Sequence, residues 1–278
     1  LDLCSNTPSG QTCNSVFNAI AVANQSAVVV GSYLQMVDVS SPLHPIMSGS
    51  LLLPGTVPGV AHNVTVVGSI AYVAVSAVTA ESLGGLVIVN IVNPSNPVVL
   101  GQLTAKGRQA RGVRVVGQRA YMANGYDGLE IVDVSNPTAP LQLGAVDFST
   151  AFAQAYDVEV VGSIAYVASG LGGIQVVNVA TPSSPSVLNV TATASQPERL
   201  AVQNNVLYVA DRAGGLLLVD IPNPGTLALR TRIATNSGLG KAVGVVVGGD
   251  TAYVAYGSDG LVLIDATTTK DPAIVADM

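Results

Sequence analysis

An acidic or amide side chain recurs along the chain, each time at the end of a five-residue apolar string. Its six occurrences are Asp38, Asn90, Asp133, Asn178, Asp220 and Asp265. A ring of six carboxylates would predict a cation site, since hard metal ions prefer oxygen ligands. However, Asn replaces Asp in two copies, and the copies lead into turns whose backbone N–H groups need an acceptor, which either residue supplies. The pattern therefore favours turn caps over a metal site.

A second set of polar residues differs from copy to copy. Its six equivalent pairs are Asn18-Ala19, His62-Asn63, Arg111-Gly112, Tyr156-Asp157, Glu198-Arg199 and Val243-Gly244. Variable polar groups at one end of an otherwise uniform repeat are typical of a ligand site. The candidate ligand-binding residues are His62, Asn63, Arg111, Tyr156, Asp157, Glu198 and Arg199. A salt-bridged rim would produce the same pattern, and so would loops that diverged without a function.

Signals of catalysis are weak. The chain has no G-x-S-x-G nucleophile elbow, no H-E-x-x-H helix and no Gly-rich phosphate loop with a Lys. His44 and His62 are its only histidines, too few for a His-built metal site or a convincing triad. The sequence therefore assigns no catalytic residue, no metal ligand and no cofactor.

The elements that must position these residues come from an internal repeat. Six versions of one apolar string occur: LQMVD at 34–38, LVIVN at 86–90, LEIVD at 129–133, IQVVN at 174–178, LLLVD at 216–220 and LVLID at 261–265. In five of the six copies an AYVA-like string precedes it. Counted from the tyrosine position of that string (Val28 in the first copy), the copies are 42 to 49 residues apart. Such a period predicts one supersecondary unit per copy.

Each unit reads as four short strands, most clearly in the third copy. There the expected strands are 112–116, 119–123, 129–134 and 141–147, separated by turns rich in Gly, Asn and Pro. Their apolar residues are consecutive rather than alternating, which indicates sheets buried on both faces. Six such units predict an all-β fold, a six-bladed β-propeller with four antiparallel strands per blade.

The repeated LVIVN-like string behind an AYVA-like strand resembles the LVIVD-repeat family. The resemblance covers about residue 16 to the C-terminus. It implies a propeller on an exported or cell-surface protein, and it brings no catalytic residues to transfer.

Residues 1–14 form a polar leader ahead of the propeller, which we expect to span residues 15–278. The leader holds the only cysteines, Cys4 and Cys13, and a lone close pair predicts a disulfide and an oxidising compartment. Two free thiols, or lipidation of Cys4, are the alternatives. Because the chain starts at Leu1 rather than Met, we expect a processed or excised product.

Composition narrows the functional class. Charged residues make up 10% of the chain, against about 25% in typical soluble proteins. The net charge of −6 argues against nucleic acid as a partner. Gly68-Ser69 divides the longest apolar stretch into two short strands, so we expect no transmembrane segment.

These features predict a non-enzymatic extracellular or cell-surface propeller. Its role would be structural, adhesive or self-assembling, in the manner of a fibre or surface layer, with protein partners that include copies of itself. An insertion in the second unit is apolar yet is expected to lie in a loop, where exposure is unfavourable without a partner. It supplies candidate assembly residues: Val75, Ala77 and Val78. The alternatives are a secreted propeller that binds a small polar ligand or glycan at the channel mouth, or a hydrolase or lyase acting there.

Overall fold

A computed structural model describes residues 17–54, 61–77, 84–148, 152–223, 225–234, 240–266 and 272–277. The predicted leader, the Cys4–Cys13 disulfide and the assembly residue Val78 lie outside these ranges. The described chain forms two compact units, residues 1–124 with 130–143 and residues 125–129 with 144–278. We call these unit 1 and unit 2.

The fold is a six-bladed β-propeller, as predicted, with six four-stranded antiparallel sheets. The first three sheets comprise β1 (Ala19–Ala23), β2 (Ser26–Val30), β3 (Tyr33–Asp38), β4 (Ile46–Leu52), β5 (Ala61–Val67), β6 (Ile70–Val75), β7 (Gly85–Asn90), β8 (Val98–Thr104), β9 (Gly112–Val116), β10 (Arg119–Ala123), β11 (Leu129–Asp133) and β12 (Leu141–Val146). The last three comprise β13 (Ala153–Val161), β14 (Ile164–Gly170), β15 (Ile174–Asn178), β16 (Ser186–Thr191), β17 (Arg199–Gln203), β18 (Val206–Ala210), β19 (Leu216–Asn223), β20 (Thr226–Ile233), β21 (Gly244–Gly248), β22 (Thr251–Ala255), β23 (Leu261–Asp265) and β24 (Ile274–Asp277).

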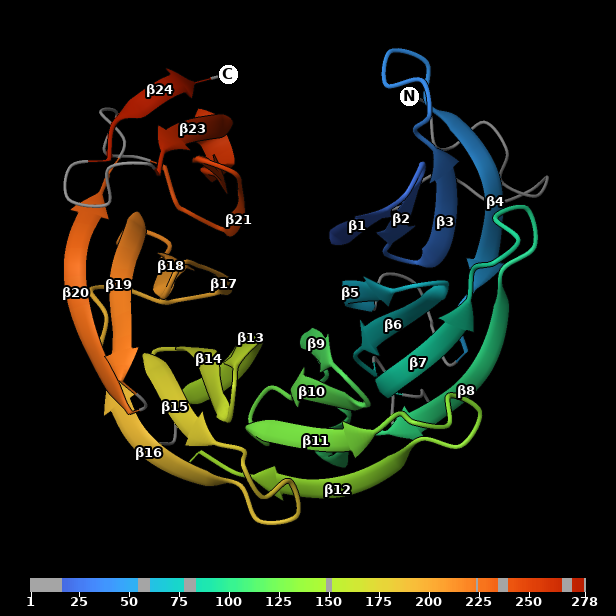
Figure 1. The fold of residues 1–278 in the computed structure, drawn as a ribbon, viewed down its shortest axis with the longest axis horizontal. Helices are drawn as coiled ribbons and strands as arrows, with labels where there is room; N and C mark the ends of the chain where they lie inside the picture. The colour runs from blue at the N-terminus through green and yellow to red at the C-terminus, as the bar shows by residue number, and fades with distance from the viewer. Residues whose placement is uncertain are drawn as a thin grey trace. The chain divides into compact units, whose positions relative to one another are not determined.

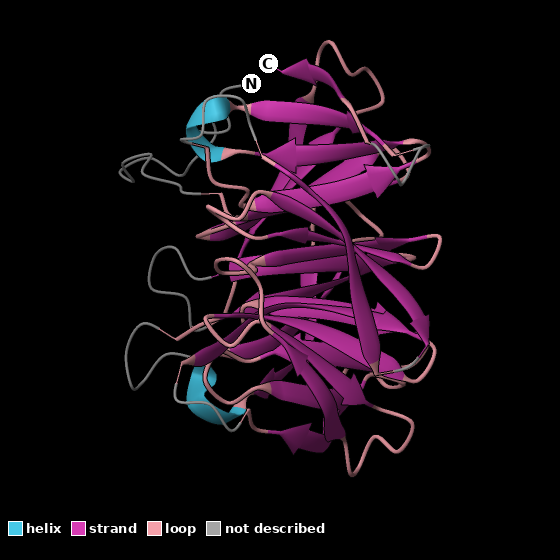
Figure 2. Ribbon diagram, turned by 90° about the vertical axis from the view of Figure 1, so that its left-hand side faces the viewer, coloured by secondary structure: helices cyan, strands magenta, loops and turns pink. Residues whose placement is uncertain are grey.

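Strands account for most of the described chain (Figure 2). Among the described residues only two short 3-10 turns occur, η1 (Lys106–Arg108) and η2 (Gly257–Asp259). None of the described helices is long and apolar enough to cross a membrane. Within unit 1 the first strands β1, β5 and β9 are neighbours along one edge of the blades, and within unit 2 β13, β17 and β21 are neighbours in the same way (Figure 1).

The middle strands of the first five blades are buried on both faces, whereas β22 and β23 of the sixth blade are partly exposed. Every residue of β18 is buried, and so are the first five residues of β7. Four of the repeated tyrosines are also buried: Tyr72, Tyr121, Tyr166 and Tyr208. Apolar clusters fill the space between the first and second blades and between the second and third in unit 1. Equivalent clusters join the fourth blade to the fifth and the fifth to the sixth in unit 2.

The repeated Asp/Asn side chains are turn caps, as the sequence indicated. Four of them accept the backbone N–H two residues further on at 2.8–2.9 Å: Asp38, Asn90, Asp133 and Asn178. Hydrogen bonds from Ser40 lower the pKa of Asp38 below its ordinary value. Asp220 instead forms an ion pair with Arg230 of the adjacent strand β20.

The turns that these caps shape lie against the fourth strand of the preceding blade. Gly49 in β4 and Gly101 in β8 are so close to the next turn that a Cβ would overlap the carbonyl oxygens of Pro94 and Pro137. The equivalent residue of β16 is Asn189, whose amide donates to the Gly225 carbonyl of the next turn at 3.0 Å. Backbone contact at this end therefore fixes the spacing of neighbouring blades within a unit.

One assembly candidate is not where the sequence analysis placed it. Val75 is the last residue of β6, pairs with Gly85 of β7, and is fully buried. The expectation that it lies in an exposed loop is wrong, because β6 continues further than the AYVA string. The next residue, Ser76, forms an isolated antiparallel bridge to Gln109, ahead of β9 in the third blade. Ala77 follows and is half-buried.

We predict that Gly101→Ala lowers the free energy of unfolding by about 1–3 kcal/mol, because the added methyl group has no space beside the Pro137 carbonyl. The matched control is Gly248→Ala in β21, where a Cβ meets nothing within 4 Å, and we expect a change within about 0.5 kcal/mol. Urea unfolding of both variants measures the difference. Equal losses in the two variants would contradict the packing argument.

Candidate binding site at the loop end of unit 2

The strand register confirms that the variable polar residues occupy equivalent positions. The second member of each pair lies opposite the residue two places after the tyrosine position: Ala19↔Val30, Asn63↔Ala74, Gly112↔Ala123, Asp157↔Ala168, Arg199↔Ala210 and Gly244↔Ala255. In β5 and β13 the pairing is irregular just before this point. His62 and Tyr156 therefore lie in bulges, which commonly redirect side chains near functional sites.

Three of the seven candidates belong to unit 1. His62 and Asn63 are half-buried on β5, and Arg111 is half-buried just before β9. Their neighbour Asn18 donates to the Ala61 carbonyl at 2.8 Å, which ties the start of β1 to β5. These residues therefore lie at the starts of the neighbouring first strands β1, β5 and β9.

The four candidates of unit 2 lie together at the starts of β13 and β17. Arg199 donates to the backbone carbonyl of Tyr156 at 3.3 Å, and the Tyr156 hydroxyl donates to Gln154 at 2.6 Å. The Asp157 carboxylate is buried and accepts the backbone N–H of Leu200 at 3.0 Å. Asp157 therefore joins the two strands, and the candidates left for recognition are Tyr156, Glu198 and Arg199.

The structure adds a residue that the sequence analysis missed, Arg212. Its Nε donates to Glu198 Oε1 at 2.6 Å, and a terminal guanidinium nitrogen lies 2.5 Å from the same oxygen. This hydrogen bond raises the pKa of Arg212 above its ordinary value. The Arg212 side chain is 39% exposed and that of Glu198 is 14% exposed, so solvent and ligands can reach the pair.

Arg212 has a backbone conformation that normally requires glycine. It follows β18 with φ of 44°. The equivalent residues are Gly125 after β10, Gly170 at the end of β14 and Gly257 after β22, with φ of 55°, 53° and 54°. All four turns close with an N–H···O bond from the glycine three residues later. A large side chain in this region is strained, and such strain is concentrated at functional sites.

Exposed apolar side chains lie on neighbouring loops at this end of unit 2. Phe152 is 71% exposed, Leu171 66% and Tyr126 59%. The backbone brings them together, because Gly125 exchanges two hydrogen bonds with Ala155 at 2.8 and 3.2 Å, and Ala153 pairs with Gly170. Beyond these, the Gly170 N–H donates to the Pro197 carbonyl beside Glu198 at 3.2 Å. Exposed aromatic and apolar groups around a polar centre are typical of a recognition surface.

A buried carboxylate fixes the connection that carries Glu198. Asp211 is fully buried and accepts hydrogen bonds from the Thr193 hydroxyl at 2.7 Å and the Ser195 N–H at 3.0 Å. Burial raises the pKa of Asp211, although these bonds oppose the shift. The equivalent residue in the third blade is Asn124, which accepts from Gln109 and donates to Lys106.

The LVIVD repeat matches six segments of the chain, residues 20–52, 58–104, 107–147, 153–193, 196–235 and 239–270. The chain belongs to the LVIVD-repeat family. No curated protein matches it. Among the described residues, no group of three or more His, Cys, Asp or Glu side chains could hold a metal ion.

Solved structures resemble this LVIVD-repeat protein in fold. The periplasmic gluconolactonase PpgL of Pseudomonas aeruginosa is 15% identical, with a TM-score of 0.73 over 95% of this chain and 85% of that one. The β-propeller domain of Cps50 (Swd1) from Myceliophteria thermophila is 12% identical, with a TM-score of 0.70 over 96% and 88%. The computationally designed protein Ika8 is 10% identical, with a TM-score of 0.64 over 95% and 87%. At these identities the likeness shows the fold alone.

We predict that Asp211→Asn changes the pH dependence of stability. The folded-state pKa of Asp211 is raised, so its contribution is present below the unfolded pKa of about 3.9 and is lost as the pH rises through the folded value. The unfolding free energy of the parent minus that of the variant should therefore fall as the pH rises above about 4. Urea unfolding across this range measures it, and a constant difference would contradict the assignment.

We predict that Arg212→Gly leaves stability unchanged or raises it by up to about 1 kcal/mol. Relief of the left-handed strain offsets the loss of a half-exposed ion pair, which is worth about 0–1 kcal/mol. In Arg212→Ala the ion pair with Glu198 is lost but the residue still has a Cβ in the left-handed conformation. This variant should therefore be less stable than Arg212→Gly by about 1 kcal/mol. If urea unfolding shows equal stability for the two variants, Arg212 is not strained.

Proposed function

We propose that this protein is a non-enzymatic, extracellular or cell-surface adhesive module that recognises a glycan at the loop end of unit 2. The observation that supports this proposal most strongly is Arg212. An arginine occupies a left-handed position that three equivalent loops give to glycine, and it pairs with Glu198. Neighbouring loops carry exposed apolar side chains. A residue that costs stability in the scaffold is best explained by a role in recognition.

The chemistry of this surface suits a sugar. The aromatic rings of Phe152 and Tyr126 are exposed and can cover the apolar C–H face of a pyranose. Guanidinium and carboxylate groups supply several donors and acceptors in fixed directions, which suits neighbouring hydroxyl groups. Arg212 and Glu198 already hold each other in place, so little side-chain freedom is lost on binding.

The hydrogen bonds of Glu198 favour a role in binding over a role in catalysis. A general acid or base must exchange a proton with the reacting group, whereas Glu198 Oε1 accepts two N–H groups of Arg212. An ion pair of this kind keeps the carboxylate oriented toward Arg212. The sparse charge of the chain and the family resemblance support an exported location, which belongs to the same proposal.

A printed array of neutral and uronic-acid-containing oligosaccharides tests the proposal, followed by calorimetry with the strongest binder. We expect the parent to bind, and Arg212→Gly and Phe152→Ala to lose at least tenfold in affinity, about 1.4 kcal/mol. The control is Leu43→Ala, which removes an 88% exposed side chain from a turn between the third and fourth strands, and it should bind like the parent.

Two results would overturn glycan recognition. One is a parent protein that binds nothing on the array. The other is a loss in Leu43→Ala equal to that in Arg212→Gly. Light scattering of the same proteins tests the self-assembling role. If the parent is an oligomer that dissociates in Phe152→Ala, the partner of this surface is a second copy of the chain rather than a glycan.

A further inference from the structure

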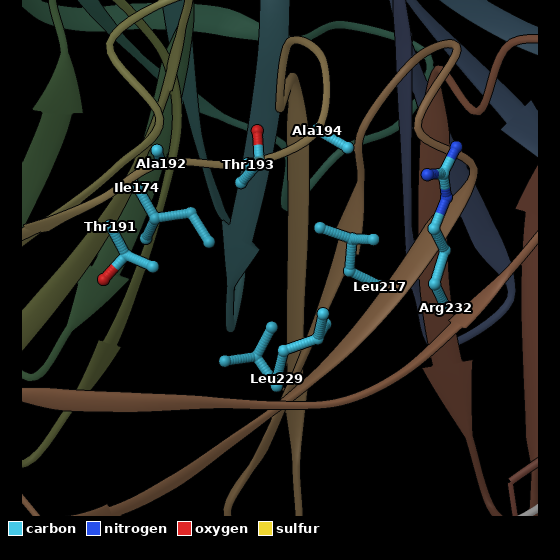
Figure 3. A pocket seen from close by; sticks show the side chains of 9 residues that line it. Ile174, Thr191, Ala192, Thr193, Ala194, Leu217, Leu229 and Arg232 are labelled. Atoms are coloured by element: carbon cyan, nitrogen blue, oxygen red, sulfur yellow. The ribbon is translucent and has the colours of Figure 1, made fainter.

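A cavity of about 170 Å³ lies in unit 2 between the fourth and fifth blades. Residues 192–194, which begin the connection to Glu198, form part of its lining. The side chains that define it come from β15, β16, β19 and β20, and they are Ile174, Thr191, Leu217, Val219, Leu229 and Arg232. Figure 3 shows Ile174, Leu217 and Leu229 pointing into the space and Arg232 at one side.

The cavity exists because the fourth blade lacks an apolar side chain that three other blades have. The residue opposite the first letter of the repeated string is Leu51 in β4, Leu103 in β8 and Ile233 in β20. Each packs against the apolar cluster between its blade and the next. The equivalent residue of β16 is Thr191, which is smaller than Leu or Ile and lines the cavity.

The walls are apolar and the mouth is cationic. The Thr193 hydroxyl donates a hydrogen bond to Asp211 at 2.7 Å, so it adds no donor to the cavity wall. Arg232 lies opposite Leu217, where the equivalent residues of β4, β8 and β16 are Ser50, Gln102 and Val190. An arginine at this position is therefore a departure from the repeat.

The Arg232 guanidinium is held at the mouth, and its positive charge lowers the pKa of the nearby Asp211 carboxyl, against the larger effect of burial. The guanidinium donates to the Ala213 carbonyl at 3.2 Å, and within the described part of the chain no ion pair involves it. The neighbouring Arg230, in contrast, pairs with Asp220. A guanidinium beside an apolar hollow selects ligands that have both a carboxylate and an apolar body.

We propose that this cavity binds a small monocarboxylate with a compact apolar body, in the size range of hexanoate or benzoate. The volume supports this range, because an apolar protein cavity of about 150 Å³ holds benzene. The apolar body would replace the missing Leu or Ile between the blades, and the carboxylate would pair with Arg232. This site is separate from the proposed glycan surface, and either proposal can fail without the other.

Titration with sodium hexanoate, followed by thermal unfolding and calorimetry of the full chain, tests the site. We expect hexanoate to raise the melting temperature of the parent and the neutral hexanamide to bind at least tenfold more weakly. Thr191→Leu should abolish binding and raise the melting temperature without ligand, because leucine restores the side chain found in two other blades. Thr191→Val, which keeps the size of the side chain, should bind hexanoate like the parent.

Arg232→Gln should weaken hexanoate binding at least tenfold and leave hexanamide binding unchanged. Three results would overturn the proposal: a parent that binds neither hexanoate nor benzoate at 10 mM (about the weak limit of specific binding), a Thr191→Leu variant that still binds, or equal affinity for hexanoate and hexanamide. Because Thr191→Leu should be more stable than the parent, its loss of binding cannot be attributed to unfolding.

Discussion

The burial of both faces of each sheet between neighbouring blades is the constraint on which the structure depends. In the first five blades the apolar strings of the third strands and the strands before them are almost wholly buried, whereas Tyr253 and Leu261 of the sixth blade are partly exposed. Each fully buried Val, Leu or Ile contributes about 1.5–3 kcal/mol. Residues in these strands are enclosed by adjacent blades and can contact a ligand only where the packing between two blades leaves a cavity, as it does beside Ile174 and Leu217. Recognition chemistry is therefore confined to the ends of the blades and to defects between them.

The two ends of a blade differ in how far they can vary. At one end, the Asx-capped turns lie against glycines in the fourth strand of the preceding blade, so Asp133 and Gly101 serve packing. At the other end, the loops after the second strands keep their backbone hydrogen bonds but change their side chains. That freedom allows one of these loops to carry Arg212 and another to carry Tyr126 without disturbing the core.

Most of the fold could be predicted because its signals are local and repeated. The four strands expected in the third copy match β9–β12 to within one residue, and the Asx caps followed from the requirement for an acceptor in each turn. Comparing the repeats also identified Glu198 and Tyr156. The loop DRAGG could have revealed Arg212, because the equivalent loops NGYDG, SGLGG and YGSDG have glycine at that position.

The remaining features depend on distances that no local pattern contains. Thr191 is an ordinary strand residue in the sequence, and the cavity beside it appears only when two blades pack together. Val75 was misplaced because the apolar insertion after the AYVA string begins as a continuation of the strand. Asp157 resembles a ligand group until its bond to the Leu200 backbone is seen.

The central claim is that recognition occurs where one copy of the repeat departs from the others. Hydrogen exchange of backbone amides with and without a bound oligosaccharide tests it most directly. The account predicts slower exchange confined to the loop end of unit 2, around Tyr126, Phe152, Glu198 and Arg212. Slower exchange at the Pro-containing turns between the third and fourth strands, with no change around Arg212, would contradict it.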